Sequence, residues 1–281
     1  MQSNLTKKVV LITGATDGLG QGIAARLAGQ GHRVLVHGRD PERTRGVANA
    51  IGAGARPYVA DFGSLAEVRR LAEGLLREES RLDVLINNAA AASRERRLSA
   101  EGYEMTFAVN YLSHFLLTRL LLPLLQRSAP SRIVNVSSVG QMPVSFDDVM
   151  LERRYSGVRA YSQSKLAQIM FTFDLARRLR AGVTVNALHP ATLMDTKMVR
   201  EVFGKSLSTV EEGVIPTVRL AIASECESFN GLYFDGAKEA RADQQAYDEE
   251  ARARLWRLSE DLTGLTADPV KEFPVAAPEK P

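Results

Sequence analysis

The sequence predicts a doubly wound α/β fold, a parallel sheet with helices on both faces, in a single domain. Two observations predict it. Six short runs rich in Val, Ile and Leu alternate with amphipathic stretches from the start of the chain. These runs are continuously apolar, as in strands that are buried on both faces of a parallel sheet. The length of 281 residues suits one large domain of this type.

Strand–helix alternation sets the expected elements and predicts right-handed crossovers between parallel strands. Two helices have clear start signals: Asp40 precedes a proline at the first helical position, and Ser64 with Glu67 forms a capping box. The predicted strands are residues 9–13, 33–37, 57–60, 84–87, 132–137 and 183–188, and the predicted helices are residues 19–30, 41–51, 64–80, 100–127 and 158–180.

The predicted domain covers residues 1–265. Residues of about 190–212 are expected to form a lid over the substrate, and residues of about 246–262 a C-terminal helix. Four prolines fall between positions 268 and 281, so residues 266–281 are expected to form a proline-rich tail outside the core.

Composition excludes several functional classes. The net charge is only +3 and the basic residues are scattered, so no nucleic-acid partner is expected. A lone cysteine, Cys226, excludes an intrachain disulfide and fits a reducing, cytoplasmic location. The four histidines are far apart, so no metal site is expected. The longest apolar segment, residues 115–125, contains Arg119 and is too short to span a bilayer.

A glycine-rich turn at residues 13–20 follows the first predicted strand and opens the first helix. Gly14 permits a tight turn, Gly18 lets the backbone approach a pyrophosphate, and Gly20 allows close helix–strand contact. The helix N-terminus presents N–H groups and the positive end of its dipole to phosphates. This context predicts a dinucleotide site. The expected contacts of the loop are Gly14, Thr16, Asp17, Gly18 and Leu19.

The end of the second predicted strand favours NADP(H) over NAD(H). An acidic residue there would hydrogen-bond the ribose hydroxyls of NAD, but here Arg39 follows the strand, with Arg43 one helical turn on. Guanidinium groups so placed can pair with a 2′-phosphate. Two features oppose this reading: Asp40 could turn inward, and Asp17 adds negative charge to the loop.

Further motifs follow in order: the Asn-Asn-Ala-Ala run at residues 87–90, Asn110, the serine pair at 137–138, and Tyr161 with Lys165. With the glycine-rich turn, they resemble the short-chain dehydrogenase/reductase superfamily over about residues 6–262. The finer resemblance is to the branch of retinol dehydrogenases and WW-domain oxidoreductases. It is carried by residues 109–118, 138–161, 161–167, 186–190 and 255–260.

The resemblance implies a Rossmann-type fold, a homodimer or homotetramer, and a set of site residues. The implied catalytic tetrad is Asn110, Ser138, Tyr161 and Lys165. The implied cofactor contacts, besides Tyr161 and Lys165, are Asp61 and Phe62 near the adenine, Asn88, Ala89 and Ala90 near the ribose, and Pro190 and Thr192 near the nicotinamide amide. The chain departs from the family pattern where Ala90 and Ala191 each replace a glycine.

The tetrad suits hydride chemistry because the protein must supply a proton to the substrate oxygen. Tyr161 and Lys165 are spaced i, i+4, so a helix places the lysine where its charge lowers the tyrosine pKa. Ser138 ends a strand at the ligand-binding edge of the sheet, and Asn110 could hold a water beside Lys165. The predicted activity is therefore reduction of a carbonyl or oxidation of an alcohol. The alternative is a non-catalytic NADP(H) sensor or scaffold.

Two apolar segments flank this site and predict an apolar, medium-sized substrate. One wall is expected from Leu193, Met194, Met198, Val199 and Phe203, and the opposite wall from Met142, Pro143, Val144 and Phe146.

Overall fold

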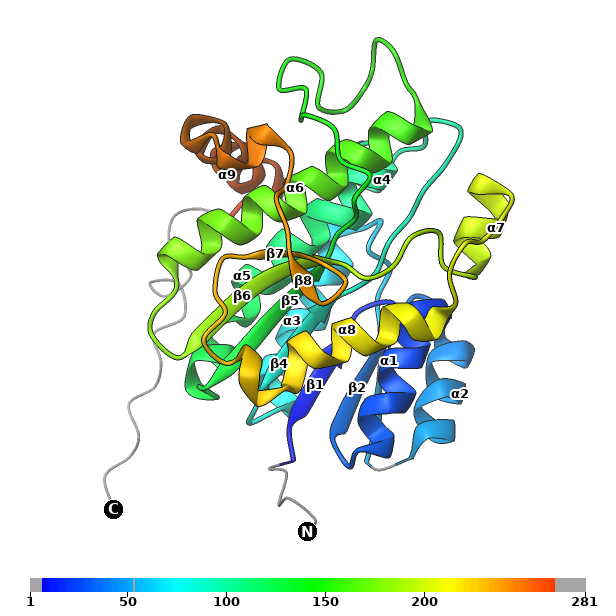
Figure 1. Ribbon diagram of the computed structural model, residues 1–281, viewed down its shortest axis with the longest axis vertical. Coiled ribbons are helices and arrows are strands. Elements are labelled where there is room, and N and C mark those ends of the chain that lie inside the picture. The colour runs from blue at the N-terminus through cyan, green and yellow to red at the C-terminus, as the bar shows by residue number, and fades with distance from the viewer. Residues whose placement is uncertain (1–6, 53, 266–281) are drawn as a thin grey trace.

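The computed structural model describes residues 7–52 and 54–265 as one sheet between two layers of helices (Figure 1). The sheet order is β3-β2-β1-β4-β5-β6-β7-β8, with parallel pairing up to β7 and an antiparallel β8. The strands are β1 (Val9–Ile12), β2 (Arg33–Gly38), β3 (Arg56–Val59), β4 (Val84–Asn87), β5 (Ser131–Val136), β6 (Val183–His189), β7 (Tyr233–Asp235) and β8 (Lys238–Glu239). The order reverses between β1 and β4, which is where ligands bind in such sheets.

Each face of the sheet has its own apolar core. Helices α1, α2 and α8 cover one face, and α3, α5, α6 and α9 cover the other (Figure 1). The helices are α1 (Gly18–Gly29), α2 (Pro41–Ile51), α3 (Leu65–Glu78), α4 (Met105–Phe107), η1 (Ala108–Leu112), α5 (Ser113–Arg127), α6 (Gly157–Arg178), α7 (Lys197–Phe203), α8 (Val210–Ile222), η2 (Ser224–Cys226), η3 (Gln244–Tyr247) and α9 (Glu249–Thr263). The predicted doubly wound fold is confirmed.

The helix predicted for residues 100–127 was wrong at its start. Gly102 has φ +83°, and the buried carboxylate of Glu104 caps the backbone N–H groups of Thr106 and Phe107, so the helix begins at Met105. It then passes through η1, one π-helical turn that contains Asn110. A π-turn widens the helix locally and is common at functional sites.

The lid predicted for residues 190–212 overlaps a helix that the sequence reading missed. Thr209 and Glu212 form a reciprocal capping box, and α8 begins at Val210. The remaining lid carries α7, whose first residue follows the N-cap Thr196. The predicted proline-rich tail at 266–281 lies outside the described residues, as does the start of the chain.

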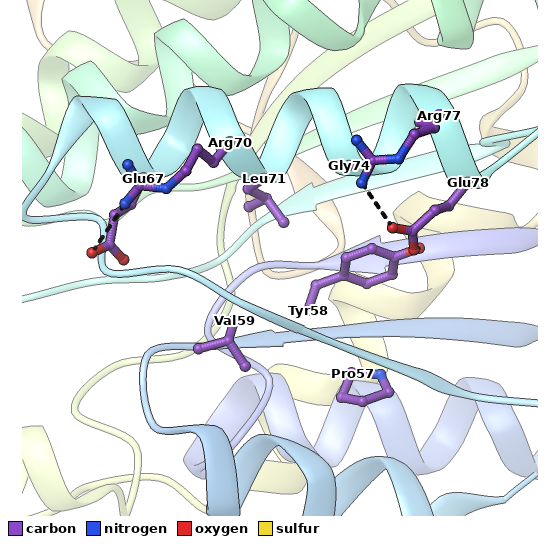
Figure 2. A pocket seen from close by; sticks show the side chains of 9 residues that line it. All are labelled: Pro57, Tyr58, Val59, Glu67, Arg70, Leu71, Gly74, Arg77 and Glu78. Carbon is purple, nitrogen blue, oxygen red and sulfur yellow. Dashed lines mark hydrogen bonds and ion pairs between the residues drawn. The ribbon is translucent and has the colours of Figure 1, made fainter.

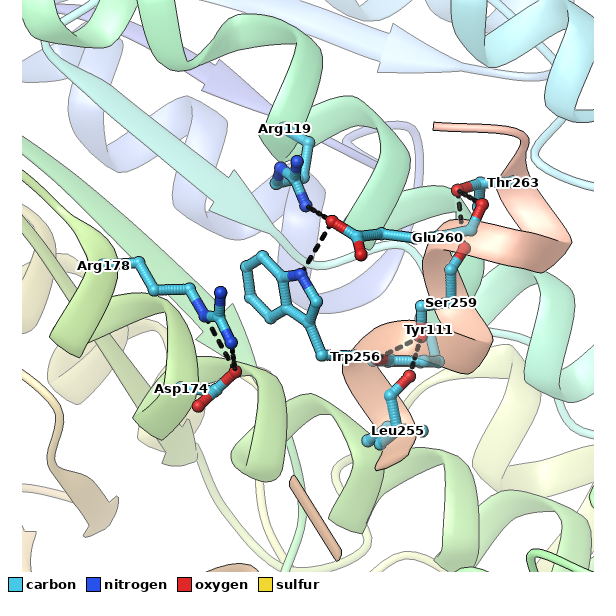
Figure 3. Close-up of polar contacts among 9 residues, drawn as sticks. All are labelled: Tyr111, Arg119, Asp174, Arg178, Leu255, Trp256, Ser259, Glu260 and Thr263. Carbon is cyan, nitrogen blue, oxygen red and sulfur yellow. Dashed lines mark hydrogen bonds and ion pairs between the residues drawn. The ribbon is translucent and has the colours of Figure 1, made fainter. Parts of the chain in front are cut away.

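Helix α9 packs across α5 and α6 (Figure 3). Trp256 lies edge-on to Phe115, with ring centroids 5.3 Å apart, and 5.8 Å from the Phe171 ring. Its indole N–H donates to Glu260, which also pairs with the buried Arg119 at 3.0 Å. The apolar face of α6 is therefore buried within the chain as core.

Among the described residues, only Met105–Arg127 has the length and apolar character to cross a membrane. In its most apolar window of 18 residues, 94% of the residues are buried inside the fold. The segment is thus placed as a core helix.

Candidate active site

The glycine-rich turn has no room for side chains, as a dinucleotide cradle requires. Gly14 and Gly18 have φ +65° and +48°. A Cβ on Gly14 would lie 2.8 Å from Cα of Ala89, and one on Gly20 would lie 2.2 Å from the carbonyl oxygen of Gly14. The backbone of this loop can therefore approach a pyrophosphate at the N-terminus of α1, so the residues present fit the cofactor.

Gly20→Ala is expected to destabilise the protein by about 1–3 kcal/mol, because its Cβ meets backbone rather than a movable side chain. It should also weaken binding of the expected dinucleotide at least about tenfold, which is about 1.4 kcal/mol. Urea denaturation and cofactor titration measure the two effects. Gly29→Ala is the matched control, since a Cβ on that exposed glycine of α1 meets nothing within 4 Å. Equal cofactor affinity in both variants would contradict the assignment of the loop.

Residues that the sequence reading missed hold the loop in place. Burial lowers the pKa of His37 to about 4, so its ring is neutral. Its Nε2 donates to the carbonyl of Ala60 at 3.1 Å, and its Nδ1 accepts the N–H of Gly14 at 3.2 Å. The position of His37 in an apolar strand gave no signal of this role.

The turn after β4 is tied to the same loop through Thr13. The Thr13 hydroxyl accepts the N–H groups of Asn88 and Ala89, each at 2.9 Å. The Asn88 amide donates back to the carbonyls of Thr13 and Gly14 at 2.9 and 3.1 Å. Ala90 follows as an exposed residue, so its methyl group does not disturb these contacts.

The end of β2 presents basic side chains beside the loop. Asp40 turns away from the site, because its carboxylate caps α2 by accepting the N–H of Arg43 at 2.9 Å. Asp17 caps α1 and pairs with Arg43 at 3.3 Å, and Arg43 also donates to the carbonyl of Thr16. Arg39 is exposed. Both acidic groups that opposed NADP(H) in the sequence are thus engaged by neighbouring residues.

Phe62 and Asp61 were both predicted to lie near the adenine. Asp61 is exposed after the end of β3, but the side chain of Phe62 is not. Phe62 is 3% exposed and its ring stacks on His37 with centroids 4.3 Å apart. Burial in the core stabilises an apolar ring more than exposure at the surface does. Phe62 therefore packs beneath the strand ends. Asp61 forms a tight turn by accepting the N–H of Gly63 at 2.8 Å.

Ser138 and Tyr161 meet at the carboxyl end of β5. The Ser138 hydroxyl lies close enough to Tyr161 to influence its pKa, and it accepts the N–H of Gly140 at 3.0 Å. Burial raises the pKa of Tyr161, while the hydrogen bond to Ser138 lowers it. Helix α6 supplies Tyr161 and Lys165 from one face, as their spacing predicted.

The backbone of Ser138 is fixed by two residues that the sequence reading missed. The buried Tyr233 hydroxyl of β7 donates to the Ser138 carbonyl at 3.0 Å, and the Gln141 amide does so at 2.9 Å. Gln141 in turn accepts the N–H of Asp243 at 2.8 Å. No motif signalled these residues, because β7 has three residues and lies far along the chain.

Lys165 extends beneath Tyr161. Its ammonium nitrogen lies 5.6 Å from the centroid of the Tyr161 ring, and its side chain is almost fully buried. Burial lowers its pKa to about 7. The lysine is therefore placed to act on the tyrosine electrostatically.

The side chain of Asn110 does not reach Lys165. Its Oδ1 accepts the N–H of Ala91 at 2.7 Å, and its Nδ2 donates to the Ala91 carbonyl and to Ser164. The expected water beside Lys165 thus has no support from the amide of Asn110. This side chain instead joins the π-turn to α6 and to the loop after β4.

The residues expected to lie beside the nicotinamide follow β6. Pro190 is buried, and the exposed Thr192 is oriented by His189, whose Nε2 lies 3.0 Å from its hydroxyl. Thr192 also receives a hydrogen bond on its carbonyl from Ser208 at 2.8 Å. The segment before α7 lies close to the glycine-rich turn, since a Cβ on Gly18 would lie 2.8 Å from Cγ2 of Thr196.

One surface pocket lies apart from Ser138, Tyr161 and Lys165. That pocket, of about 290 Å³, lies between β3 and α3 (Figure 2). Its arginines pair with its own glutamates, Arg70 with Glu67 at 3.5 Å and Arg77 with Glu78 at 3.3 Å. It therefore offers no uncompensated charge to a ligand. Within residues 7–52 and 54–265, no cluster of His, Cys, Asp and Glu could hold a metal ion.

Comparison with known proteins identifies the family. A family model described as short chain dehydrogenase matches residues 8–206. The chain belongs to this family. Human retinol dehydrogenase 13 is 39% identical over 298 residues, covering 98% of this chain and 90% of that protein. The predicted resemblance to the retinol dehydrogenase branch is confirmed.

Solved structures of short-chain dehydrogenases share the fold over most of the chain. An uncharacterised protein from Mycobacterium paratuberculosis has a TM-score of 0.78 at 31% identity, covering 93% of this chain and 96% of its own. RhlG from Pseudomonas aeruginosa, described as an active-site complex with NADP, has a TM-score of 0.69 at 28% identity, covering 82% and 95%. The chain is thus an enzyme of the oxidoreductase family that uses a nicotinamide cofactor.

Proposed function

We propose that this enzyme transfers a hydride between NADP(H) and the carbonyl or alcohol carbon of an apolar, medium-sized substrate. The observation that carries the proposal is the arrangement of Ser138 and Tyr161, whose hydroxyls lie close enough for Ser138 to lower the pKa of Tyr161, beside the buried ammonium of Lys165. A donor pair beside a fixed positive charge suits a substrate oxygen that becomes negative during reduction.

The nicotinamide would supply or accept the hydride, and the protein manages the proton. In reduction, the Tyr161 hydroxyl gives its proton to the substrate oxygen; in oxidation, its phenolate takes that proton back. Ser138 donates a hydrogen bond to the same oxygen. Because burial alone raises the pKa of Tyr161, the positive charge of Lys165 is needed to favour the phenolate.

Preference for NADP(H) is supported by the basic residues beside the phosphate loop. Arg39→Ala is expected to weaken NADPH binding about 10–100-fold and to leave NADH binding unchanged, because a charge-assisted pair with the 2′-phosphate is lost. Cofactor titration by fluorescence measures both. Arg45→Ala, an exposed arginine of α2, is the control. Equal loss for NADPH and NADH would contradict a phosphate contact.

Apolar side chains around the site support an apolar substrate, although the predicted walls are only partly present. Met142 is 43% exposed and Val139 is 47% exposed, both just after Ser138. Val144 and Val199 are buried at 3% and 6%, so they belong to the core and not to a wall. The side chain of Phe203 lies outside the described part. Because retinol dehydrogenases are among the relatives, retinoid-like alcohols and aldehydes are the first substrate class to test.

NADPH oxidation across a panel of apolar ketones and aldehydes tests the proposal, with NADH alongside. Turnover with NADPH on apolar members is expected. Activity confined to small charged carbonyls would contradict the substrate class, and NADPH binding without any turnover would favour the non-catalytic sensor. A cytoplasmic location and a homo-oligomeric state stay predictions.

A further inference from the structure

The buried ammonium of Lys165 is held by neutral oxygen atoms. Its Nζ donates to the carbonyl of Val136 at 2.8 Å and to Oε1 of Gln168 at 3.0 Å. Within the described part of the chain, no carboxylate lies within ion-pair distance of Lys165. Two of its three N–H groups are thereby bound by oxygen atoms inside the protein.

We propose that Gln168 is a positioning residue: it fixes the ammonium of Lys165 beneath Tyr161 and keeps it charged in a buried site. The proposal deepens the proposed function and rests on it for its catalytic meaning. Because Gln168 is itself 1% exposed, its amide cannot exchange this contact for water. Nothing in the tetrad motif includes this residue, which lies three positions after Lys165 on α6.

The orientation of the Gln168 amide follows from the ammonium of Lys165. An ammonium requires an acceptor, so Oε1 faces Lys165 and Nε2 faces His114, 3.3 Å from its Nδ1. If the amide were rotated by half a turn, its NH2 group would face the ammonium of Lys165, and both groups are donors. The contact therefore works in one orientation, as a positioning role demands.

His114 borders this arrangement as a neutral ring, but its Nδ1 does not accept a hydrogen bond from Gln168. Its Nδ1 lies 2.9 Å from the carbonyl of Asn110, which needs a proton on that nitrogen. Its Nε2 then accepts from the Thr13 hydroxyl at 3.0 Å, whose lone pairs already receive two backbone N–H groups. Burial lowers the pKa of His114 to about 3, in agreement with the neutral form. No second cation therefore competes with Lys165 for Gln168.

Three other titratable groups face Lys165 from the elements around it. Tyr161 shares α6, His114 comes from α5, and His189 comes from the end of β6. Burial lowers the pKa of both histidines, so both are uncharged at neutral pH. The oxygen atoms of Val136 and Gln168 are thus the groups that stabilise the charged form of Lys165.

The test measures the pKa of Lys165 directly in the cofactor-free protein, by NMR of ¹³Cε-labelled lysine. The Lys165→Met variant identifies the signal by its absence. Gln168→Met removes the acceptor at similar volume and should lower the pKa of Lys165 by about one unit. Gln168→Glu places a carboxylate there and should raise it by about one unit or more.

Gln163 supplies matched controls, because it is a fully buried glutamine on the same helix. Its amide donates to the carbonyl of Val149 at 2.8 Å, away from Lys165. Gln163→Met and Gln163→Glu should leave the pKa of Lys165 unchanged. If Gln168→Met does not fold, the rise in Gln168→Glu over Gln163→Glu decides the question.

Activity is lost as Lys165 loses its proton. In turnover, the high-pH limb of kcat should therefore move to lower pH in Gln168→Met and to higher pH in Gln168→Glu. An unchanged pKa in the Gln168 variants, or shifts of one sign in both, would overturn the positioning role. Opposite shifts in the cofactor-free protein with no turnover on any substrate would support that role while contradicting the proposed function.

Discussion

Tyr161→Phe is expected to lower kcat by a factor of about 10²–10⁴, because the reaction loses its proton donor while the ring still fills its place. NADPH affinity should change little, since the ring and the phosphate loop stay in position. Steady-state turnover and cofactor titration on the same preparation measure the two quantities. The ratio of the effects distinguishes a chemical role from a binding role.

Tyr58→Phe is the control for loss of a buried tyrosine hydroxyl. Its hydroxyl donates to Glu79 at 2.8 Å, far from the catalytic residues along β3. Its kcat should match that of the unmodified enzyme. Full activity in Tyr161→Phe would remove Tyr161 from the proposed chemistry.

Trp256→Ala is expected to destabilise the fold by about 3–5 kcal/mol, the range for deletion of a large buried ring. The indole packs between α5 and α6, and its centroid lies 4.9 Å from the guanidinium of Arg119 and 4.1 Å from that of Arg178. Its loss also removes a hydrogen-bond donor to Glu260, the partner of the buried Arg119. The midpoint of urea denaturation measures the effect.

Arg257→Ala provides the comparison, because Arg257 is exposed on the same helix next to Trp256. It should change the free energy of unfolding by no more than about 0.5 kcal/mol. A small loss in Trp256→Ala would mean that α9 contributes little to the packing of α5 and α6.

Much of the fold was predictable because the strands are continuous apolar runs and most helices carry local start signals. Ser64 and Asp40 cap helices where the sequence placed them. The start of the helix near residue 100 was not predictable, because Glu104 acts as a buried N-cap and no preferred N-cap residue marks that position. The capping box of Thr209 and Glu212 was a usable signal for α8 that the sequence reading did not use.

Some residues of the candidate site were also predictable from the sequence and others were not. Residues fixed by backbone constraint or helical spacing, such as Gly20, Tyr161 and Lys165, could be found from the sequence, because geometry dictates their types. The residues that hold them could not. Gln168 and Tyr233 act through contacts between segments far apart in the chain or through a side-chain orientation, and neither leaves a pattern. The position of Phe62 beside His37 depended on three-dimensional packing for the same reason.

The proposed reaction is direct hydride transfer from NADPH to a substrate carbon, with a proton from Tyr161. A single turnover with NADPH deuterated at both C4 positions tests it most directly, with the alcohol product analysed by mass spectrometry and NMR. The account predicts one deuterium, bonded to the carbinol carbon, in the unmodified enzyme and almost no product in Tyr161→Phe. Alcohol that forms without deuterium at that carbon would contradict it.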